Sequence, residues 1–401
     1  MTQDNINIHE VKEIRLKTLV YFGCGAITKI ADIAAQLKKR NIQKVLVVSG
    51  RGAYKATGAW DYVVKAFKDN DLSYVLYDKV TPNPTTIQID EAVKSAVGAQ
   101  AVVAIGGGSP IDAGKSAAIL LANPEYNADQ LYNYEFTPEK AVPVVAINLT
   151  HGTGTEVDRF AVATIPVSEF KPAIAYDCIY PEWAIDDPAL MTGLSEKQTR
   201  FVSIDAVNHC VEAATSLVAS PFAISLARES IALVAKYLPL ALKDPKDLTA
   251  RYYLLYASML AGTSFDNGML HYTHALEHPL SAVKPDLTHG LGLAMLLPAV
   301  IKRIYPSRGE VLADILSSIV PDLCGCPSEA DKAAKGVEKW LFANGATQKL
   351  ADEGFSAADI DKLVNLVFTT PSLGLLLSLA PDKADQAAVR EIYENSLQKL
   401  A

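Results

Sequence analysis

The residues best suited to chemistry in this chain are histidines and an aspartate in its second half. Four of the seven histidines fall between residues 271 and 289: His271, His274, His278 and His289. Upstream, Asp205 and His209 stand four residues apart on a segment with helical periodicity, which places both on one face of a helix. A carboxylate and several imidazoles, without thiolates, form a ligand set suited to Fe(II), Zn(II) or a similar divalent ion.

The spacing of these residues carries more weight than any one of them. Asp205, His209 and Glu212 share a helical face, so a polar cluster would point toward an interior, which is costly unless something pairs with it. A single histidine is more often a satisfied core or surface residue. An Asp-x3-His spacing together with the His-x3-His spacing of His274 and His278 favours a metal centre.

A glycine-rich loop follows a buried strand in the first half. The strand predicted at 101–105 runs into Gly106-Gly107-Gly108-Ser109-Pro110, and a helix is expected from Ile111. Ser109 is suited to the N-cap and Pro110 to the first helical position. Bare backbone N–H groups at a helix start bind pyrophosphate. The loop is neither G-x-G-x-x-G nor a P-loop. A tight strand-to-helix turn without a ligand is therefore the alternative.

A second loop raises the case for a dinucleotide. Thr150-His151-Gly152-Thr153-Gly154-Thr155 follows the strand expected at 142–147, and ligands of such sheets bind at the carboxyl ends of the strands. After the strand at 44–48 the chain reads Ser49-Gly50-Arg51-Gly52, without the carboxylate that often binds the NAD ribose. Arg51 is placed to contact a 2′-phosphate, which favours NADP over NAD; the alternative is a solvated loop arginine.

The predicted elements divide the chain into two parts. Strand and helix patterns alternate up to about residue 187, which indicates an α/β domain with a parallel, Rossmann-like sheet covered by helices on both faces. From Met191 onward long amphipathic stretches replace the strands: 197–218, 223–242, 249–264 and 289–304. We expect an α/β domain over 1–187 and an all-α domain over 188–401.

Composition restricts the partners and the compartment. The 401 residues are 50% hydrophobic and 20% charged with a net charge of -8, which disfavours nucleic acid and anionic membranes as partners. No apolar run is long enough to span a membrane, and the first ten residues do not form a signal peptide. The five cysteines form no disulfide framework, and Cys324-Gly-Cys326 lacks a second Cys/His pair for metal. We expect ordinary reduced cysteines and a cytoplasmic protein.

Linked motifs make the chain resemble the iron-containing (group III) alcohol dehydrogenases over nearly its whole length. These are the Gly106–Asp112 loop, Gly152-Thr153-Gly154-x-Glu156-Val157, Asp205-Ala206-x-x-His209-x-x-Glu212-Ala213, and His274-x3-His278-Pro279-Leu280 followed by His289-Gly290. The resemblance implies a dehydroquinate synthase-like fold with the active site between the two domains.

Matching positions imply roles for individual residues. The implied metal ligands are Asp205, His209, His274 and His289, with His278 near substrate and cofactor. The implied cofactor positions, besides Ser49, Gly50 and Arg51, are Asn83, Gly107, Gly108, Ser109, Asp112, Thr150, Thr153 and Lys171, and Phe160 and Phe265 line the substrate pocket. Three residues depart from the family pattern: Leu149, His151 and Thr288.

The implied reaction is reversible hydride transfer between a nicotinamide and a small primary alcohol or aldehyde, assisted by a divalent metal, with Fe(II) favoured and Zn(II) the alternative. His278 is the first candidate for a proton relay and His271 the second. A homo-oligomer is implied. The alternatives are a polyol dehydrogenase, which would lack the counterpart of His209, a dehydroquinate-synthase-like lyase, and a non-enzymatic nucleotide and metal sensor.

Overall fold

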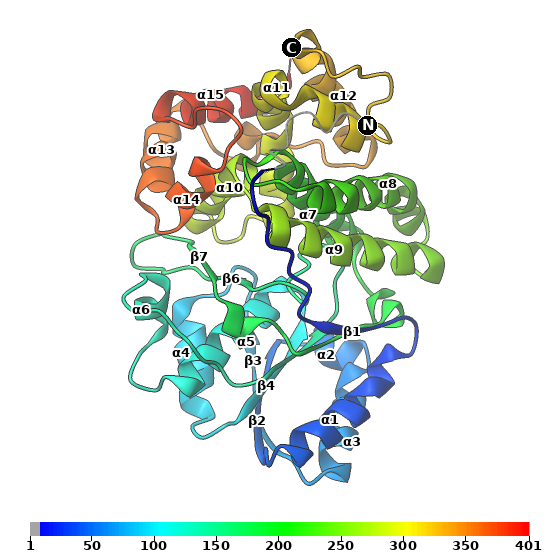
Figure 1. The fold of residues 1–401 in the computed structure, drawn as a ribbon, viewed down its shortest axis with the longest axis vertical. Helices are drawn as coiled ribbons and strands as arrows, with labels where there is room; N and C mark the ends of the chain where they lie inside the picture. The colour runs from blue at the N-terminus through cyan, green and yellow to red at the C-terminus, as the bar shows by residue number, and fades with distance from the viewer. Residues whose placement is uncertain (1–8, 401) are drawn as a thin grey trace.

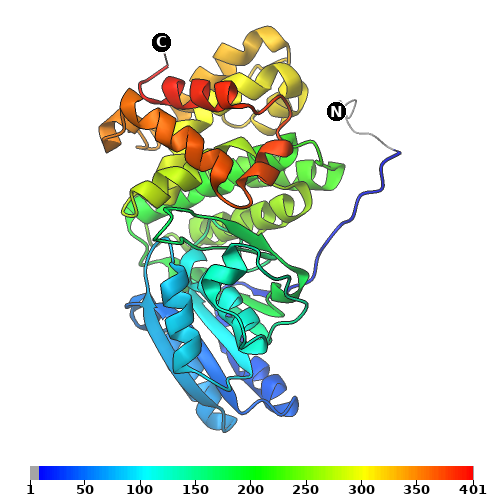
Figure 2. The ribbon, with the colours of Figure 1, turned by 90° about the vertical axis from the view of Figure 1, so that its left-hand side faces the viewer.

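The computed structural model describes residues 9–400, so most of the segment judged for a signal peptide lies outside it. An α/β part built around a sheet and a helical part are stacked along the long axis (Figures 1 and 2). The sheet has six strands in the order β1-β8-β5-β4-β2-β3, and every neighbouring pair is parallel. Its strands are β1 (Leu19–Phe22), β2 (Lys44–Gly50), β3 (Ser73–Val80), β4 (Ala101–Gly106), β5 (Val144–Asn148) and β8 (Trp183–Asp186).

The sheet is covered on both faces because its central strands are apolar over most of their length. On β2, Val45 and Val47 pack into the layer with α1 (Ile30–Lys39) and α3 (Ala59–Asp69). The intervening Leu46 and Val48 pack into the opposite layer, with α4 (Thr86–Ser95) and α5 (Gly108–Ala122). This is the pattern of a parallel sheet buried on both sides, and it confirms the predicted α/β class.

The strands that the sequence reading did not assign are short. β8 has four residues and lies between β1 and β5, while β6 (Phe160–Val162) and β7 (Ala173–Ala175) form a separate antiparallel pair. Runs of three or four residues carry too little periodicity to be recognised. The remaining short elements of this part are η1 (Ala26–Lys29), α2 (Ala53–Ala56), α6 (Ala128–Tyr132) and η2 (Asp177–Ile179).

The second half is helical, as predicted, and α7 to α11 carry the chemistry-bearing residues. Serine and aspartate caps set the starts: Ser195 and Gln198 form a capping box on α7, and Asp247 caps α9. The helices are α7 (Glu196–Thr215), α8 (Pro221–Lys243), α9 (Leu248–Gly268), α10 (Tyr272–Val283), α11 (His289–Ile315), α12 (Ala330–Ala343), α13 (Ile360–Thr369), α14 (Leu373–Ser378) and α15 (Gln386–Ser396), with short turns η3 (Pro188–Met191), η4 (Pro327–Glu329), η5 (Leu350–Glu353) and η6 (Ala357–Asp359).

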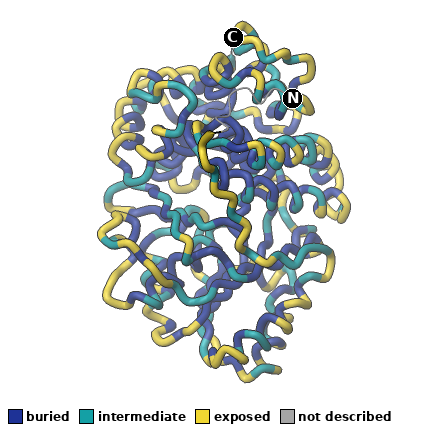
Figure 3. The backbone as a smooth tube through the Cα atoms, viewed as in Figure 1, coloured by how far each residue is buried: buried dark blue, intermediate teal, exposed yellow. Residues whose placement is uncertain are grey.

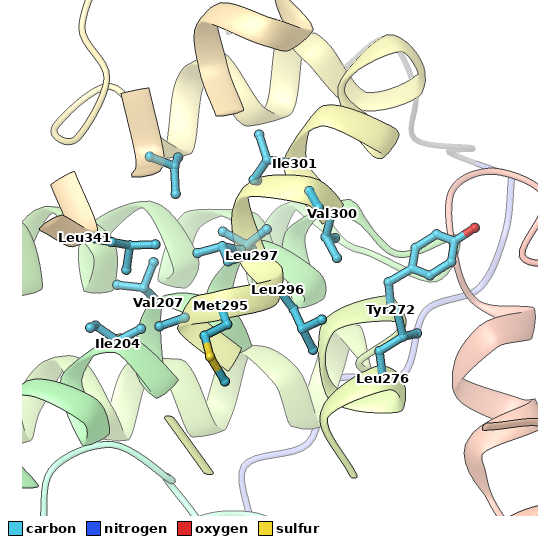
Figure 4. Packing of buried hydrophobic residues seen from close by; sticks show 14 of the residues in the cluster. Ile204, Val207, Tyr272, Leu276, Met295, Leu296, Leu297, Val300, Ile301 and Leu341 are labelled. Carbon is cyan, nitrogen blue, oxygen red and sulfur yellow. The ribbon is translucent and has the colours of Figure 1, made fainter. Parts of the chain in front are cut away.

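One apolar cluster holds these helices together. Val207 of α7, Leu276 of α10 and Met295 of α11 belong to the same buried core, shown close up in Figure 4. Buried backbone runs through the middle of both parts, with exposed residues at the periphery (Figure 3). The core therefore fixes the relative positions of three helices whose polar side chains form the site. Within residues 9–400, no helix is long and apolar enough to cross a membrane.

Candidate metal and cofactor site

Three helices bring the predicted metal ligands to one point. Asp205 and His209 on α7 and His274 on α10 each offer a ligand atom, all within 4.8 Å of one another. Asp205 Oδ1 lies 3.4 Å from His209 Nε2 and 3.5 Å from His274 Nε2. His289, the first residue of α11, places its Nε2 3.9 Å from the same oxygen. One carboxylate oxygen thus faces three imidazole nitrogens.

Two of the converging atoms have no hydrogen-bond partner among residues 9–400. Asp205 Oδ1 and His274 Nε2 are buried and make no hydrogen bond to any described residue. Buried polar atoms are nearly always paired, so orphaned atoms that face one another indicate a missing partner. A divalent cation accepts a lone pair from each of these atoms, and the set of one carboxylate and three imidazoles fits such an ion.

A second layer of carboxylates orients two of the imidazoles. Glu212 Oε2 accepts a hydrogen bond from His274 Nδ1, and Glu277 Oε2 accepts one from His289 Nδ1. With the Nδ1 proton held in this way, each ring can offer its Nε2 to a cation on the side of Asp205. The other oxygen of Glu212 accepts the backbone N–H groups of His271 (2.9 Å) and Thr273 (2.8 Å) at the start of α10.

The electrostatics of the cluster also favour a cation. Burial alone would lower the pKa of His274, but Glu212 and Asp205 outweigh it and raise that pKa to about 9. Burial likewise opposes ionisation of Glu212, yet its contacts with His274 and His271 lower its pKa to about 2. His209 has no such carboxylate behind its ring, and burial lowers its pKa to about 4. The anionic carboxylates therefore favour a positive charge at the imidazoles, which a bound cation would supply.

His278 lies next to the ligand cluster in a defined tautomer. Its Nδ1 is 2.8 Å from the carbonyl oxygen of Lys171, so Nδ1 carries the proton and Nε2 keeps a lone pair. The ring centroid is 5.9 Å from that of His289 and 6.4 Å from that of His274. Burial, with the positive charge of Lys171, lowers the pKa of His278 well below its usual range, so the ring is neutral at neutral pH.

His271 has a different setting. It is fully buried at the N-terminus of α10, where its Nδ1 accepts the N–H of Tyr272 at 2.7 Å. Its Nε2 lies 2.9 Å from Thr215 Oγ1. Both ring nitrogens are thus engaged within the protein, which suits a residue that holds the helix start more than one that transfers protons.

The two predicted pocket phenylalanines lie beside the ligands. Phe265 on α9 stacks on the His209 ring with centroids 4.5 Å apart, and Phe160 on β6 lies 5.3 Å from Phe265. An apolar wall therefore borders the metal ligands on the His209 side.

The two glycine loops meet because β4 and β5 are neighbours and end at the same sheet edge. A Cβ on Gly107 would lie 2.7 Å from Thr150 Oγ1, and one on Gly108 would lie 2.7 Å from Thr153 Cγ2. Only glycine admits this approach, which leaves the main chain of the first loop bare. The predicted cofactor positions Gly107, Gly108, Thr150 and Thr153 therefore form one structural unit.

The prediction that Ser109 caps the following helix is wrong. Helix α5 begins at Gly108, so Gly107 is the N-cap, and it provides no side-chain hydrogen bond. Pro110 accordingly lies in the third helical position. The reason is that the glycines allow the helix to start two residues earlier, which leaves the first N–H groups without a side-chain cap and suited to an anion.

Asp112 and Lys115, on the helix that follows the first loop, have their polar atoms paired within the protein. Asp112 accepts the Thr155 hydroxyl at 2.7 Å and the Val162 N–H at 3.0 Å. Lys115, fully buried on the same helix, donates to Thr155 Oγ1, Asp158 Oδ1 and two backbone carbonyls at 2.8–2.9 Å. Asp112 and Lys115 therefore hold the 155–162 segment against α5. The sequence analysis did not predict this anchoring role.

The remaining predicted cofactor residues lie at several places. Ser49 is buried and donates to the Ile105 carbonyl at 2.8 Å, next to Gly50, whereas Arg51 is exposed. Asn83 donates to the Pro285 carbonyl at 3.0 Å, which joins the α/β part to the loop before α11. Lys171 is buried, with its ammonium 2.7 Å from Ser281 Oγ and 3.3 Å from Glu277 Oε2. In this arrangement Lys171 contacts the carboxylate behind His289.

Three polar residues around the site were missed or left unassigned. Sequence spacing could have indicated Glu277 and the orienting role of Glu212. Each carboxylate lies within four residues of a proposed ligand on the same helix. His151, the departure in the second loop, turns away from the first loop toward α9. Its Nε2 accepts a hydrogen bond from the fully buried Arg251 at 2.9 Å, and nothing in the spacing links those two residues.

A dinucleotide-type sheet edge, bare glycine loops and a buried Asp/His cluster define a metal-dependent, nucleotide-binding oxidoreductase. Residues 17–188 match the family described as iron-containing alcohol dehydrogenase, and residues 201–397 match its C-terminal domain family. The chain belongs to this family and is an alcohol dehydrogenase. It is 60% identical to a long-chain primary alcohol dehydrogenase of Thermoanaerobacter ethanolicus over 398 residues, covering 99% of this chain and 100% of the relative.

More distant relatives share the architecture. The chain is 32% identical to a 1,3-propanediol dehydrogenase of Klebsiella pneumoniae over 351 residues, which cover 86% of this chain and 89% of the relative. The solved structure of an NADH-dependent butanol dehydrogenase from Thermotoga maritima superposes with a TM-score of 0.89 at 28% identity, covering 97% of this chain and 99% of that one. The fold and family expected from the sequence are thereby confirmed.

Proposed function

We propose that this alcohol dehydrogenase oxidises primary alcohols, and reduces the corresponding aldehydes, at an Fe(II) ion held by Asp205, His209, His274 and His289. The observation that carries the proposal is the orphaned, buried pair Asp205 Oδ1 and His274 Nε2, 3.5 Å apart among further imidazoles. When bound, the ion supplies Lewis acidity toward a substrate oxygen and the nicotinamide supplies or accepts the hydride. Zn(II) is the alternative ion for the same donors.

The protein's own residues prepare this chemistry. Glu212 and Glu277 hold two ligand imidazoles in one tautomer, so the donors need no reorganisation. His278 presents a neutral Nε2 lone pair, which can receive a proton released on alcohol oxidation, and its Nδ1–H stays on the Lys171 carbonyl. His271 is the weaker relay candidate, because both of its nitrogens are engaged.

Substrate choice follows from the apolar wall. Phe160 and Phe265 offer no charged group to a substrate, which favours an alkyl chain over an acidic or phosphorylated molecule. The 60% identical relative is named for long-chain primary alcohols, and we extend the proposed substrates to that class. A diol remains the second candidate because a 1,3-propanediol dehydrogenase is among the relatives, although His209 is present here. If the protein were the lyase or the sensor, it would show no net turnover of alcohols.

We propose NADP as the preferred cofactor. Arg51 follows β2 at the sheet edge, is exposed and makes no hydrogen bond or ion pair with residues 9–400, so its guanidinium is available to a 2′-phosphate. Asp78 on the neighbouring strand has one carboxylate oxygen engaged by the Tyr54 hydroxyl at 2.8 Å. The Thermotoga relative is named NADH-dependent, which is the competing choice. The glycine loops would hold the pyrophosphate in either case.

The remaining organisation is also proposed. We place the domain boundary at Asp187-Pro188, between β8 and the first helix of the second half. We propose a homodimer, because β1 is an edge strand and the exposed apolar side chains of Val11, Ile14 and Leu16 lead into it. A cytoplasmic location agrees with the five free cysteines.

The test is a matrix of cofactors and substrates. Initial rates would be measured with NADPH and NADH against butanal, longer aldehydes, 3-hydroxypropanal and a phosphorylated aldehyde, for the wild type and for Arg51→Ala. The expected result is turnover of alkyl aldehydes with NADPH preferred, and a loss of that preference by about tenfold in Arg51→Ala. A strong NADH preference that Arg51→Ala leaves unchanged would refute the cofactor proposal. Absence of turnover with every aldehyde would refute the function.

A further inference from the structure

The pair Cys324 and Cys326 has an arrangement that the catalytic function does not use. Both side chains are exposed, in the segment between α11 and α12 at the end of the helical part away from the sheet (Figure 1). The Cys324 thiol donates to Cys326 Sγ across 2.7 Å.

The turn that brings the sulfurs together is built into the fold. Gly325 between them has a φ of +83°, a left-handed conformation that glycine adopts readily and that turns the chain back on itself. A Cβ on Gly309 of α11 would clash with the Gly325 carbonyl oxygen, and one on Gly325 would lie 2.8 Å from Glu310 Cα. The turn therefore packs directly on the α11 backbone and fits only because both positions are glycine.

A carboxylate fixes the turn from the other side. Glu329 Oε2 accepts the N–H of Cys324 at 2.9 Å, the N–H of Gly325 at 3.1 Å and the Tyr305 hydroxyl at 3.2 Å. Tyr305 is fully buried on α11, so the core fixes the position of the Glu329 carboxylate. The carboxylate then fixes the backbone of the Cys324–Cys326 turn. These tertiary contacts fix the backbone of the turn and so keep the two cysteines close together.

A soft metal ion is a poorer explanation than oxidation. Among residues 9–400, the only group of three or more potential ligands within 4.8 Å of one another is the Asp205 cluster, so the cysteine pair has no third ligand. Two thiolates alone leave a tetrahedral ion half coordinated. By contrast, two thiols in contact need only lose two electrons and two protons to form a disulfide.

We propose that Cys324 and Cys326 form a reversible disulfide, a modification site driven by a low-molecular-weight disulfide such as oxidised glutathione. One thiolate attacks a glutathione sulfur, forming a mixed disulfide and releasing one glutathione thiolate. The second cysteine thiolate then attacks the protein sulfur of that mixed disulfide and releases the second glutathione. Two protein thiols are oxidised, and one glutathione disulfide is reduced to two thiols. Because the closed loop spans only three residues, the bond adds little stability and stays exchangeable.

Peptide mass mapping of the folded enzyme in glutathione redox buffers tests the proposal. We expect the peptide containing both cysteines to lose two hydrogens and carry no glutathione, whereas the isolated exposed Cys24 acquires a mixed disulfide. In Cys326→Ser, Cys324 should instead retain glutathione. In guanidinium, at the same buffer ratio, the disulfide fraction should fall by about tenfold, because the packed turn is lost.

Alcohol oxidation rates verify that the wild type and Cys326→Ser are both folded. The proposal would be overturned if both cysteines of the folded enzyme stay as thiols or each carry glutathione. It would equally be overturned if the unfolded chain forms the disulfide as readily as the folded one, since the packed turn would then contribute nothing.

Discussion

The metal side and the cofactor side of the site are built in opposite ways. Around Asp205 the polar atoms face one another and two of them have no hydrogen-bond partner in the described part of the chain, so the side chains themselves indicate a ligand. Around the glycine loops, Asp112 binds Thr155 and Ser49 binds a strand carbonyl, whereas the buried Glu156 carboxylate has no hydrogen-bond partner among residues 9–400. There the bare main chain is what remains for a ligand. The proposed metal site is thus indicated by unsatisfied side chains that face one another, and the proposed phosphate site by glycines that leave the main chain bare.

Removal of the shared carboxylate should have the largest effect. Asp205→Asn keeps the shape but removes the charge that faces three imidazoles. We expect loss of bound metal and a fall in kcat/KM of roughly a thousandfold, since Lewis acid assistance supplies several kcal/mol. Metal content and alcohol oxidation would be measured together. Full activity with bound metal in this variant would show that Asp205 is not a ligand.

The orienting carboxylates should matter less. Glu212→Gln leaves every proposed ligand in place but weakens the constraint on the His274 tautomer. We expect metal affinity to fall by about 10- to 100-fold, with activity largely recovered at high metal concentration.

Glu196→Gln is the matched control, because Glu196 lies exposed on the same helix and its pairing with Arg200 is a surface contact. If the two substitutions weaken metal binding equally, the orienting role of Glu212 is disproved.

On the cofactor side, the informative substitution adds a methyl group to the glycine loop, whereas on the metal side it removes a charge. Gly107→Ala places a Cβ 2.7 Å from Thr150 Oγ1, so the two loops must separate. Overpacking of about 1–3 kcal/mol, expressed in cofactor binding, raises the cofactor Kd by about tenfold or more. Metal content should stay at the wild-type level.

Gly193→Ala is the control, since a Cβ there meets nothing within 4 Å. Cofactor titration by nicotinamide fluorescence measures both variants. Unchanged cofactor binding in Gly107→Ala would break the assignment of this loop.

The last prediction concerns stability and its dependence on pH, away from the metal and the cofactor. Burial, with Arg251 beside it, lowers the pKa of His151 from 6.5 to about 3, so the folded state requires a neutral ring. Because the folded pKa lies below the unfolded one, this contribution is complete above pH 6.5 and is lost as the pH falls toward 3. Denaturant unfolding of His151→Gln should therefore depend less steeply on pH in that window. Identical pH profiles for the two proteins would contradict the buried neutral histidine.

The sequence predicted the cluster around Asp205 better than the residues that orient and support that cluster. Asp205 could be paired with His209, and His274 with His278, by helical spacing because the period of a helix is regular. The distance from His274 to His289 crosses a loop, so only the resemblance linked them. Contacts such as His151 with Arg251, 100 residues apart, have no local signal at all. The start of α5 was misplaced because propensity favours Ser109 as a cap, whereas packing of the glycines against Thr150 and Thr153 decides it.

The most direct test of the central claim is anaerobic removal of metal followed by stepwise addition of Fe(II), in parallel with Zn(II). NADPH oxidation with butanal would be followed alongside bound metal. The account predicts that activity returns in proportion to Fe(II) bound, up to one ion per chain, and that Asp205→Asn does not recover. Turnover that persists without metal, or recovery that is unaffected by Asp205→Asn, would contradict it.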